Sequence, residues 1–144
     1  MDIEIWQLTP WDDLDMVLRL VIAAILGGLI GVEREHAEKP AGLRTLLLVC
    51  TGSALFTVAS IYGFGGASDA ARVAAGIVAG IGFLGAGTIL RSEHGVVGIT
   101  TAATIWTVAA IGLAVGAGLY LVAVVTTVIA LIALRFLAPP RENR

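Results

Sequence analysis

The sequence has few charged residues. Only 14% of its 144 residues are Asp, Glu, Lys or Arg, against about 25% in a typical soluble domain. Hydrophobic residues make up 58% of the chain, and the mean hydropathy is +0.94. The polar segments are too short to build a second, soluble domain, so we expect a single domain over residues 1–144. Basic tracts and nucleic-acid-reading motifs are also missing, which argues against a nucleic-acid partner.

Cysteine and catalytic motifs are equally scarce. Cys50 is the only cysteine, which excludes an intrachain disulfide and a Cys/His zinc cluster. The pattern Gly80-x-Gly82-x-x-Gly85 lies in an apolar run without a βαβ context, so it does not indicate a dinucleotide site. No nucleophile has a recognisable base and orienting residue. We therefore expect a protein that is not an enzyme and that needs no cofactor, with Mg²⁺ as the one ion to consider.

Long apolar runs dominate what is present. They predict an all-α membrane protein with a bundle of five transmembrane helices, at about residues 16–32, 43–62, 70–90, 100–115 and 119–137. Pro40 and Gly42 break the chain between the first two helices. Thr100 and Thr101 are expected to cap the fourth helix. The acidic N-terminus lacks the basic region of a cleaved signal peptide, so the first run is expected to stay in the mature protein.

The basic residues predict the orientation of the bundle. Five spans put the two termini on opposite sides of the membrane. One side carries seven of the nine basic residues, namely Arg34, Lys39, Arg44, Arg91, Arg135, Arg141 and Arg144. The positive-inside rule makes this side cytoplasmic, so the N-terminus is outside and the C-terminus cytoplasmic. Arg19 lies inside the first span, where Asp15 is four residues away and is expected to pair with it.

Glycine is abundant in the third predicted helix. In lipid, small residues let helices approach closely, so we expect residues 70–115 to form the packed centre of the bundle. The predicted packing positions are Gly27, Gly31, Gly76, Gly80, Gly82, Gly85 and Gly87. The same stripes would also suit a homo-oligomer, with a dimer favoured. The first and third helices share glycine pairs and a following Arg, which suggests a duplicated helical hairpin.

A polar cluster is predicted at the cytoplasmic ends of these helices. Its members are Glu33, Arg34, Glu35, Arg44, Arg91, Thr100, Thr101 and Thr104. Three interpretations remain open. Glu33 and Glu35 could hold a hydrated Mg²⁺, which often binds through one or two carboxylates. Arg44 and Arg91, with nearby helix N-termini, could hold an anionic headgroup or a partner's carboxylate. The charges could also be solvated and only set the topology. Glu33 and Arg44 are expected to pair across the first hairpin.

Four ordered motifs resemble a known family. The segments GGLIGVERE, AGLRTLLLVCTGSALF, GIGFLGAGTILR and GITTAATIWTVAAIGLAVGAGLY are similar to those of the MgtC/SapB family of bacterial inner-membrane proteins. The resemblance covers about residues 16–137. It implies a multi-pass, five-span domain in the inner membrane with the N-terminus outside. In the name-giving branch, an Arg and an Asn stand where this chain has Val97 and Thr100, so a role that depends on that Asn does not carry over.

The resemblance also implies a function. Family members are associated with growth in low magnesium and with survival inside host phagocytes, and the name-giving branch is described as modulating other membrane machinery. Many members carry a cytoplasmic C-terminal domain, so a chain that stops at Arg144 is expected to be a short, SapB-like member or a truncated one. We expect a protein of magnesium homeostasis and virulence physiology that binds a membrane-protein partner or an ion. The alternative is a small transporter or channel for Mg²⁺ or another divalent cation.

Overall fold

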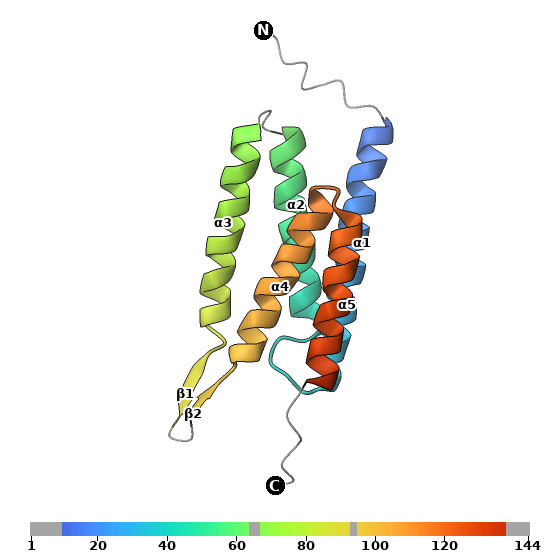
Figure 1. Ribbon diagram of the computed structural model, residues 1–144. Helices are drawn as coiled ribbons and strands as arrows, with labels where there is room; N and C mark the ends of the chain where they lie inside the picture. Colours follow the sequence, from blue (N-terminus) through green and yellow to red (C-terminus); the bar gives the residue numbers. More distant parts are fainter. Residues whose placement is uncertain (1–9, 64–66, 93–94, 138–144) are drawn as a thin grey trace.

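The computed structural model describes residues 10–63, 67–92 and 95–137. The elements are α1 (Pro10–His36), α2 (Leu43–Gly63), α3 (Ala67–Ala86), β1 (Leu90–Ser92), β2 (Gly95–Val97), α4 (Ile99–Gly116) and α5 (Tyr120–Phe136). Successive helices alternate in direction, so the start of α1 and the end of α5 lie at opposite ends of the molecule (Figure 1). The all-α prediction with five helices is confirmed, and a short hairpin is added to it.

Three of the helices are long and apolar enough to cross a membrane, namely Asp12–His36, Leu43–Gly63 and Ile99–Gly116. Two shorter apolar helices, Ala70–Ala86 and Tyr120–Phe136, complete the set. A 17-residue helix such as α5 is about 25 Å long at 1.5 Å per residue, slightly less than a hydrocarbon core of about 30 Å. That all five helices cross the membrane stays a prediction, as does the side on which each end lies.

The first helix is longer than its apolar run. It was expected over residues 16–32 and extends over Pro10–His36. Acidic Asp12 and Asp13 stand in its first turn and basic Arg34 and His36 in its last turn, where each sign of charge stabilises the helix dipole. A helix continues as long as its backbone groups can form hydrogen bonds, so the hydropathy pattern marked only the apolar middle of α1.

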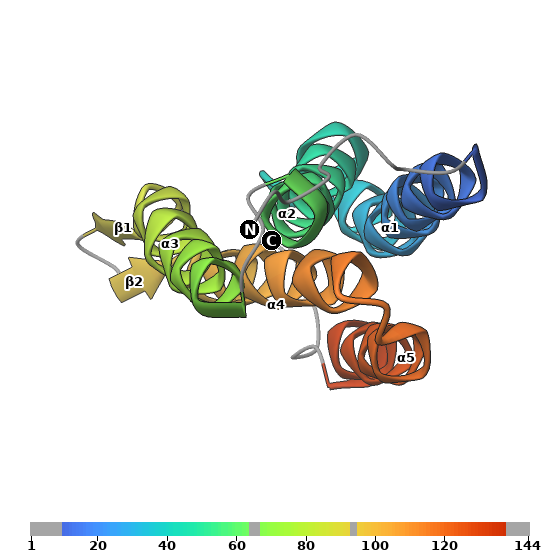
Figure 2. The same cartoon turned by 90° about the horizontal axis from the view of Figure 1, so that it is seen from above.

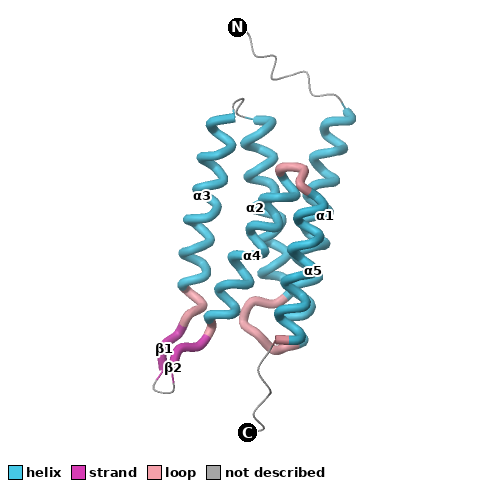
Figure 3. Tube along the Cα trace, in the orientation of Figure 1, coloured by secondary structure: helices cyan, strands magenta, loops and turns pink. Residues whose placement is uncertain are grey.

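The third helix ends earlier than expected, and a β-hairpin follows it (Figure 3). The prediction of helix up to residue 90 is wrong, because α3 stops at Ala86 and the Thr88 hydroxyl donates to the Gly85 carbonyl at 2.8 Å. Strands β1 and β2 then pair antiparallel, with Leu90 opposite Val97. The predicted Thr100–Thr101 cap is also wrong: Gly98 is the N-cap of α4, with a φ of 92° and no side-chain bond.

Helix α4, not α3, is the centre of the bundle. Viewed from above, α4 runs through the middle of the molecule, with α2, α3 and α5 around it (Figure 2). It packs against all four other helices, whereas the main contacts of α3 in the described part of the chain are with α2 and α4. The core side chains come mainly from α1, α2 and α4, among them Ile30, Leu46, Cys50, Val108 and Ile111.

The predicted packing role of the glycines holds for some positions and fails for others. A methyl group at Gly27 would lie 2.5 Å from the Cys50 Cβ, and one at Gly31 would lie 2.6 Å from the Leu43 Cα. Gly85 meets Ala102 at 3.6 Å. By contrast, Gly76, Gly80 and Gly82 have no neighbour within 4 Å of such a methyl, and Gly87 faces only its own preceding turn. Within the predicted packed centre, residues 70–115, the glycines from 76 to 82 therefore make no close contact with the described residues, whereas Gly85 and the α4 part of the range do.

Helix α4 carries the close contact that was assigned to α3. A methyl at Gly112 would overlap the Cys50 carbonyl oxygen, and one at Gly116 would lie 2.7 Å from the Ala54 carbonyl oxygen. One turn before Gly112 on α4, the Ala109 carbonyl accepts a hydrogen bond from the Ser53 hydroxyl at 2.7 Å. Small residues on α4 thus let the backbones of α2 and α4 approach each other. The duplicated-hairpin hypothesis stays a prediction.

Candidate functional site

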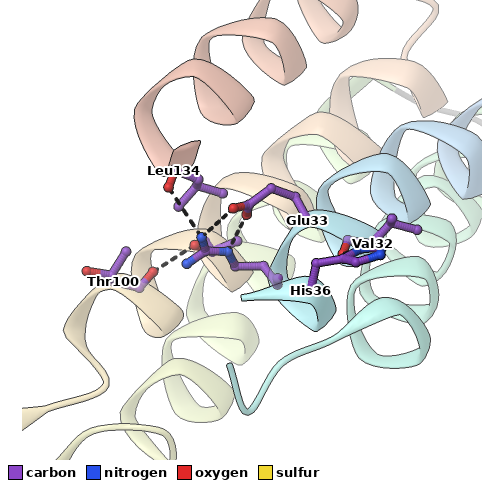
Figure 4. Close-up of polar contacts among 7 residues, drawn as sticks. Val32, Glu33, His36, Thr100 and Leu134 are labelled. Carbon is purple, nitrogen blue, oxygen red and sulfur yellow. Dashed lines mark hydrogen bonds and ion pairs between the residues drawn. The ribbon is translucent and has the colours of Figure 1, made fainter. Parts of the chain in front are cut away.

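The C-terminal end of α1, which the charge pattern predicts to be cytoplasmic, carries a part-buried ion pair (Figure 4). The guanidinium of Arg34 donates from Nε and Nη2 to the two carboxylate oxygens of Glu33, at 2.5 and 2.8 Å. Arg34 is only 4% exposed, while the Glu33 side chain is 17% exposed. A two-pronged bond of this kind fixes the geometry of both groups and is among the stronger polar contacts in proteins.

Arg34 also connects α1 to α5. Its Nη2 donates a long hydrogen bond of 3.4 Å to the Leu134 carbonyl, in the last turn of α5, where the helix dipole favours a cation. The predicted pairing of Glu33 with Arg44 is wrong, because Glu33 is occupied by its chain neighbour. Arg44 lies exposed in the first turn of α2. The local pair forms because the two side chains need no loop to bring them together.

The remaining members of the predicted cluster separate into two groups. Thr101 and Thr104 are buried on α4, and the Thr104 hydroxyl donates to the Thr100 carbonyl at 2.7 Å. Thr100 and Arg91 are exposed, and Arg91 lies on the β1 strand. At this end of the bundle, Arg34, Thr101 and Thr104 are therefore buried, whereas Arg44, Arg91 and Thr100 lie on the surface.

The two carboxylates proposed for Mg²⁺ point to different partners. The Glu35 Oε2 atom accepts a hydrogen bond from the Leu43 backbone N–H at 3.0 Å, so Glu35 satisfies the free amino end of α2. Glu33 instead binds Arg34. Residues two apart on a helix do not face each other. Within the described residues, no group of three or more His, Cys, Asp or Glu side chains is placed to hold a metal ion. A magnesium site at Glu33 and Glu35 stays a prediction.

A second polar cluster lies at the opposite end of α1. The predicted pair of Arg19 with Asp15 is confirmed, at 2.7 Å. Arg19 also donates to the Gly116 carbonyl at the end of α4 at 2.7 Å and lies 5.5 Å from the ring centre of Tyr62. Tyr120 donates to Asp15 at 3.4 Å. Spacing within α1 revealed the ion pair, whereas nothing in the sequence linked Arg19 to residues about 100 positions away.

Two grooves open on the outside of the bundle. The first, of about 570 Å³, lies between α2 and α3, and its lining residues are Val49, Ser53, Phe56, Val73, Gly76, Ile77, Gly80, Ile81 and Leu84. The second, of about 730 Å³, lies between α1 and α5, and its lining residues are Leu29, Val32, Glu33, His36, Ala37, Leu131 and Arg135. The first is almost wholly apolar, and the second joins an apolar part to a charged part. Neither groove was predicted from the sequence.

Comparisons with known proteins identify relatives of this chain. The chain is 45% identical over 127 residues to the "Putative magnesium transporter YhiD" of Escherichia coli K12, covering 83% of this chain and 59% of that protein. It is 41% identical over 140 residues to Protein SapB of Bacillus subtilis, covering 92% of this chain and 59% of that protein. It is 46% identical over 117 residues to Protein MgtC of Salmonella typhimurium LT2, covering 81% of this chain and 50% of that protein. No solved structure matches the chain.

The chain thus spans between about half and three-fifths of the length of these relatives. The MgtC family profile matches residues 20–142, which include every helix except the start of α1. Together with the apolar helices, these similarities confirm the resemblance inferred from the motifs: the chain belongs to the MgtC family of membrane proteins.

Proposed function

We propose that this protein is a non-enzymatic, multi-pass protein of the bacterial inner membrane that acts in magnesium-linked stress or virulence physiology by binding another membrane helix. In this proposal all five helices span the membrane, and the partner helix is α3 of a second copy. The single observation that supports the partner is the open α2–α3 groove. The magnesium link rests on the relative whose name calls it a putative magnesium transporter.

The groove has the chemistry of a helix-packing surface. Gly76 and Gly80 line it and are spaced four residues apart, with no heavy atom within 4 Å of an added methyl. Lipid tails are as apolar as Leu, so helices in a membrane associate through close packing over small residues. The groove's one hydroxyl, on Ser53, already donates to Ala109. What remains is an apolar surface with a glycine stripe, which suits an apolar helix with small residues of its own.

Two substitutions on α3 test this interface. Gly80→Leu fills the groove, whereas Gly82→Leu adds the same side chain where no neighbour lies within 4 Å and outside the residues that line the groove. We expect Gly80→Leu to weaken dimerisation at least about fivefold, as overpacking of about 1 kcal/mol would, and Gly82→Leu to leave it unchanged. The dimer fraction is measured by single-molecule photobleaching in liposomes at several protein-to-lipid ratios. A monomeric wild type, or loss of the dimer only in Gly82→Leu, would contradict the proposal.

The alternative function is transport of Mg²⁺ or another divalent cation. The name of the YhiD relative favours it, and the Glu33 side chain is only 17% exposed. Against it, that carboxylate is bound by Arg34 on both oxygens. Flux of Mg²⁺ into liposomes containing the purified protein and a magnesium-sensitive dye separates the two functions. We expect no flux above that of empty liposomes; flux in the wild type that is lost in Glu33→Gln would establish transport instead.

A further inference from the structure

The α1–α5 groove combines an apolar part with a charged part. Leu29 and Val32 on α1 and Leu131 on α5 form its apolar part. Glu33, His36 and Arg135 line its other part, one turn further toward the ends of the same two helices. In a membrane protein, an apolar stretch that passes into basic residues at helix ends marks the depth at which acyl chains meet headgroups. The groove therefore has the polarity profile of a phospholipid.

The charges in the groove favour an anion. The negative charge of Glu33 is neutralised by its two bonds to Arg34. Arg34 also covers the Leu134 carbonyl, which reduces the negative end of the α5 dipole beside Arg135. Arg135 is exposed, and no hydrogen bond or ion pair ties it to another residue of the described chain. One cation thus remains uncompensated in the groove.

His36 is placed to add a second donor. Its Nδ1 atom lies 2.8 Å from the Val32 carbonyl oxygen, so Nδ1 carries the hydrogen in this bond. The opposite ring nitrogen is left for a ligand and becomes a donor when the ring is protonated. The combination of an arginine and a histidine above an apolar surface matches a headgroup phosphate with an acyl chain below it.

We propose that the α1–α5 groove binds one anionic phospholipid. Its phosphate contacts Arg135 and His36, and the first part of one acyl chain lies along Leu29, Val32 and Leu131. A volume of about 730 Å³ is within the range of about 300–1,000 Å³ typical of small-molecule sites, enough for a headgroup and the start of a chain. The site is separate from the α2–α3 groove, so it does not depend on dimerisation.

Native mass spectrometry of the whole chain tests this site. The purified protein is mixed with equal amounts of phosphatidylglycerol and phosphatidylcholine, and the ratio of the two one-lipid complexes is measured. We expect phosphatidylglycerol to be preferred and Arg135→Gln to reduce that preference about fivefold, the usual contribution of one arginine near an anionic surface. Arg135→Lys keeps most of the preference. The matched control is Arg44→Gln, another exposed arginine at the same end of the bundle, which leaves it unchanged.

Three outcomes would overturn the proposal. An equal loss of the phosphatidylglycerol preference in Arg44→Gln would mean that this lipid is attracted by diffuse positive charge and not by this groove. Displacement of the lipid by an equal concentration of glycerol phosphate would identify a site for soluble phosphate. A dimer signal that disappears in Arg135→Gln would make the groove an interface with a second copy. The thermal unfolding midpoint of each variant in detergent, expected to match the wild type, verifies that the substitutions leave the fold intact.

Discussion

Two arginines on α1 each join this helix to the C-terminal end of another helix. Arg19 pairs with Asp15 and donates to Gly116 at the end of α4. Arg34 pairs with Glu33 and donates to Leu134 near the end of α5. In both cases a carboxylate of α1 neutralises the cation, and a carbonyl that has no partner within its own helix takes one of its hydrogens. The arginines thus contribute tertiary contacts as well as topology-setting charge.

Arg34 is the charged side chain whose removal should cost most. Arg34→Met leaves the Glu33 carboxylate unpaired and the Leu134 carbonyl without its donor. We expect the free energy of unfolding to fall by about 2–3 kcal/mol, below the figure of about 3–5 kcal/mol for a fully buried pair, because Glu33 is 17% exposed. Unfolding with dodecyl sulfate in mixed micelles measures the change.

The control for this prediction is Arg44→Met, which removes an exposed arginine from the same end of the molecule and should change stability by less than about 0.5 kcal/mol. Combining Arg34→Met with Glu33→Gln should recover part of the loss, because the unpaired charge is then gone. An equal loss of stability in the Arg34 and Arg44 variants would show that the ion pair does not stabilise the fold.

The glycines of α3 and α4 look alike in the sequence but have opposite surroundings. Gly112 and Gly116 on α4 lie against the backbone of α2, whereas Gly76, Gly80 and Gly82 on α3 face open space. The spacing Gly112-x-x-x-Gly116 was a signal that could have identified the α4 contact, and it was obscured by the larger number of glycines in α3. Spacing shows that a helix has a small-residue face, but not whether that face meets another helix of the same chain.

Adding one methyl group to each helix separates these two roles. In Gly112→Ala the new carbon overlaps the Cys50 carbonyl oxygen and lies 3.0 Å from the Ser53 Cβ. We expect a loss of about 1–3 kcal/mol from this overpacking, because α2 and α4 must separate. Gly82→Ala has no neighbour within 4 Å and should be neutral or stabilising by up to about 1 kcal/mol, since Ala favours helix over Gly. Unfolding in detergent micelles that keep the protein monomeric measures the change in the free energy of unfolding for both variants. Similar losses in the two variants would contradict a close helix contact at Gly112 that is absent at Gly82.

The β-hairpin between α3 and α4 shows a limit of sequence patterns. Its strands have three residues each, too few for a hydrophobic period to be recognised. Ile89, Val96 and Val97 are β-branched and favour extended backbone, which was the available signal. The hairpin also requires Gly98 to adopt a positive φ at the start of α4, where a methyl would overlap the Thr88 carbonyl oxygen.

The proposed orientation of the whole molecule can be tested at two exposed loop positions. Lys39 lies between α1 and α2, and Ala117 lies between α4 and α5, at opposite ends of the bundle. In a Cys50→Ala background, Lys39→Cys and Ala117→Cys are exposed to a membrane-impermeant maleimide in intact cells. If the N-terminus is outside, Ala117→Cys is labelled at once and Lys39→Cys only after the membrane is permeabilised. The reverse pattern would place the basic end outside and contradict the positive-inside prediction.

The sequence by itself determined that this is a membrane protein of five apolar helices, the approximate position of each helix, the Asp15–Arg19 pair and the family. Each of these depends on composition, on spacing within one helix or on contiguous motifs. Only the tertiary structure decided that α4 is central, that Arg34 holds Glu33 and reaches α5, that Gly76, Gly80 and Gly82 on α3 are open, and where the two grooves lie. These features depend on which helix faces meet, and that is set by contacts such as Arg34 to Leu134, across 100 positions. Residue spacing along one helix carries no information about a contact of that range.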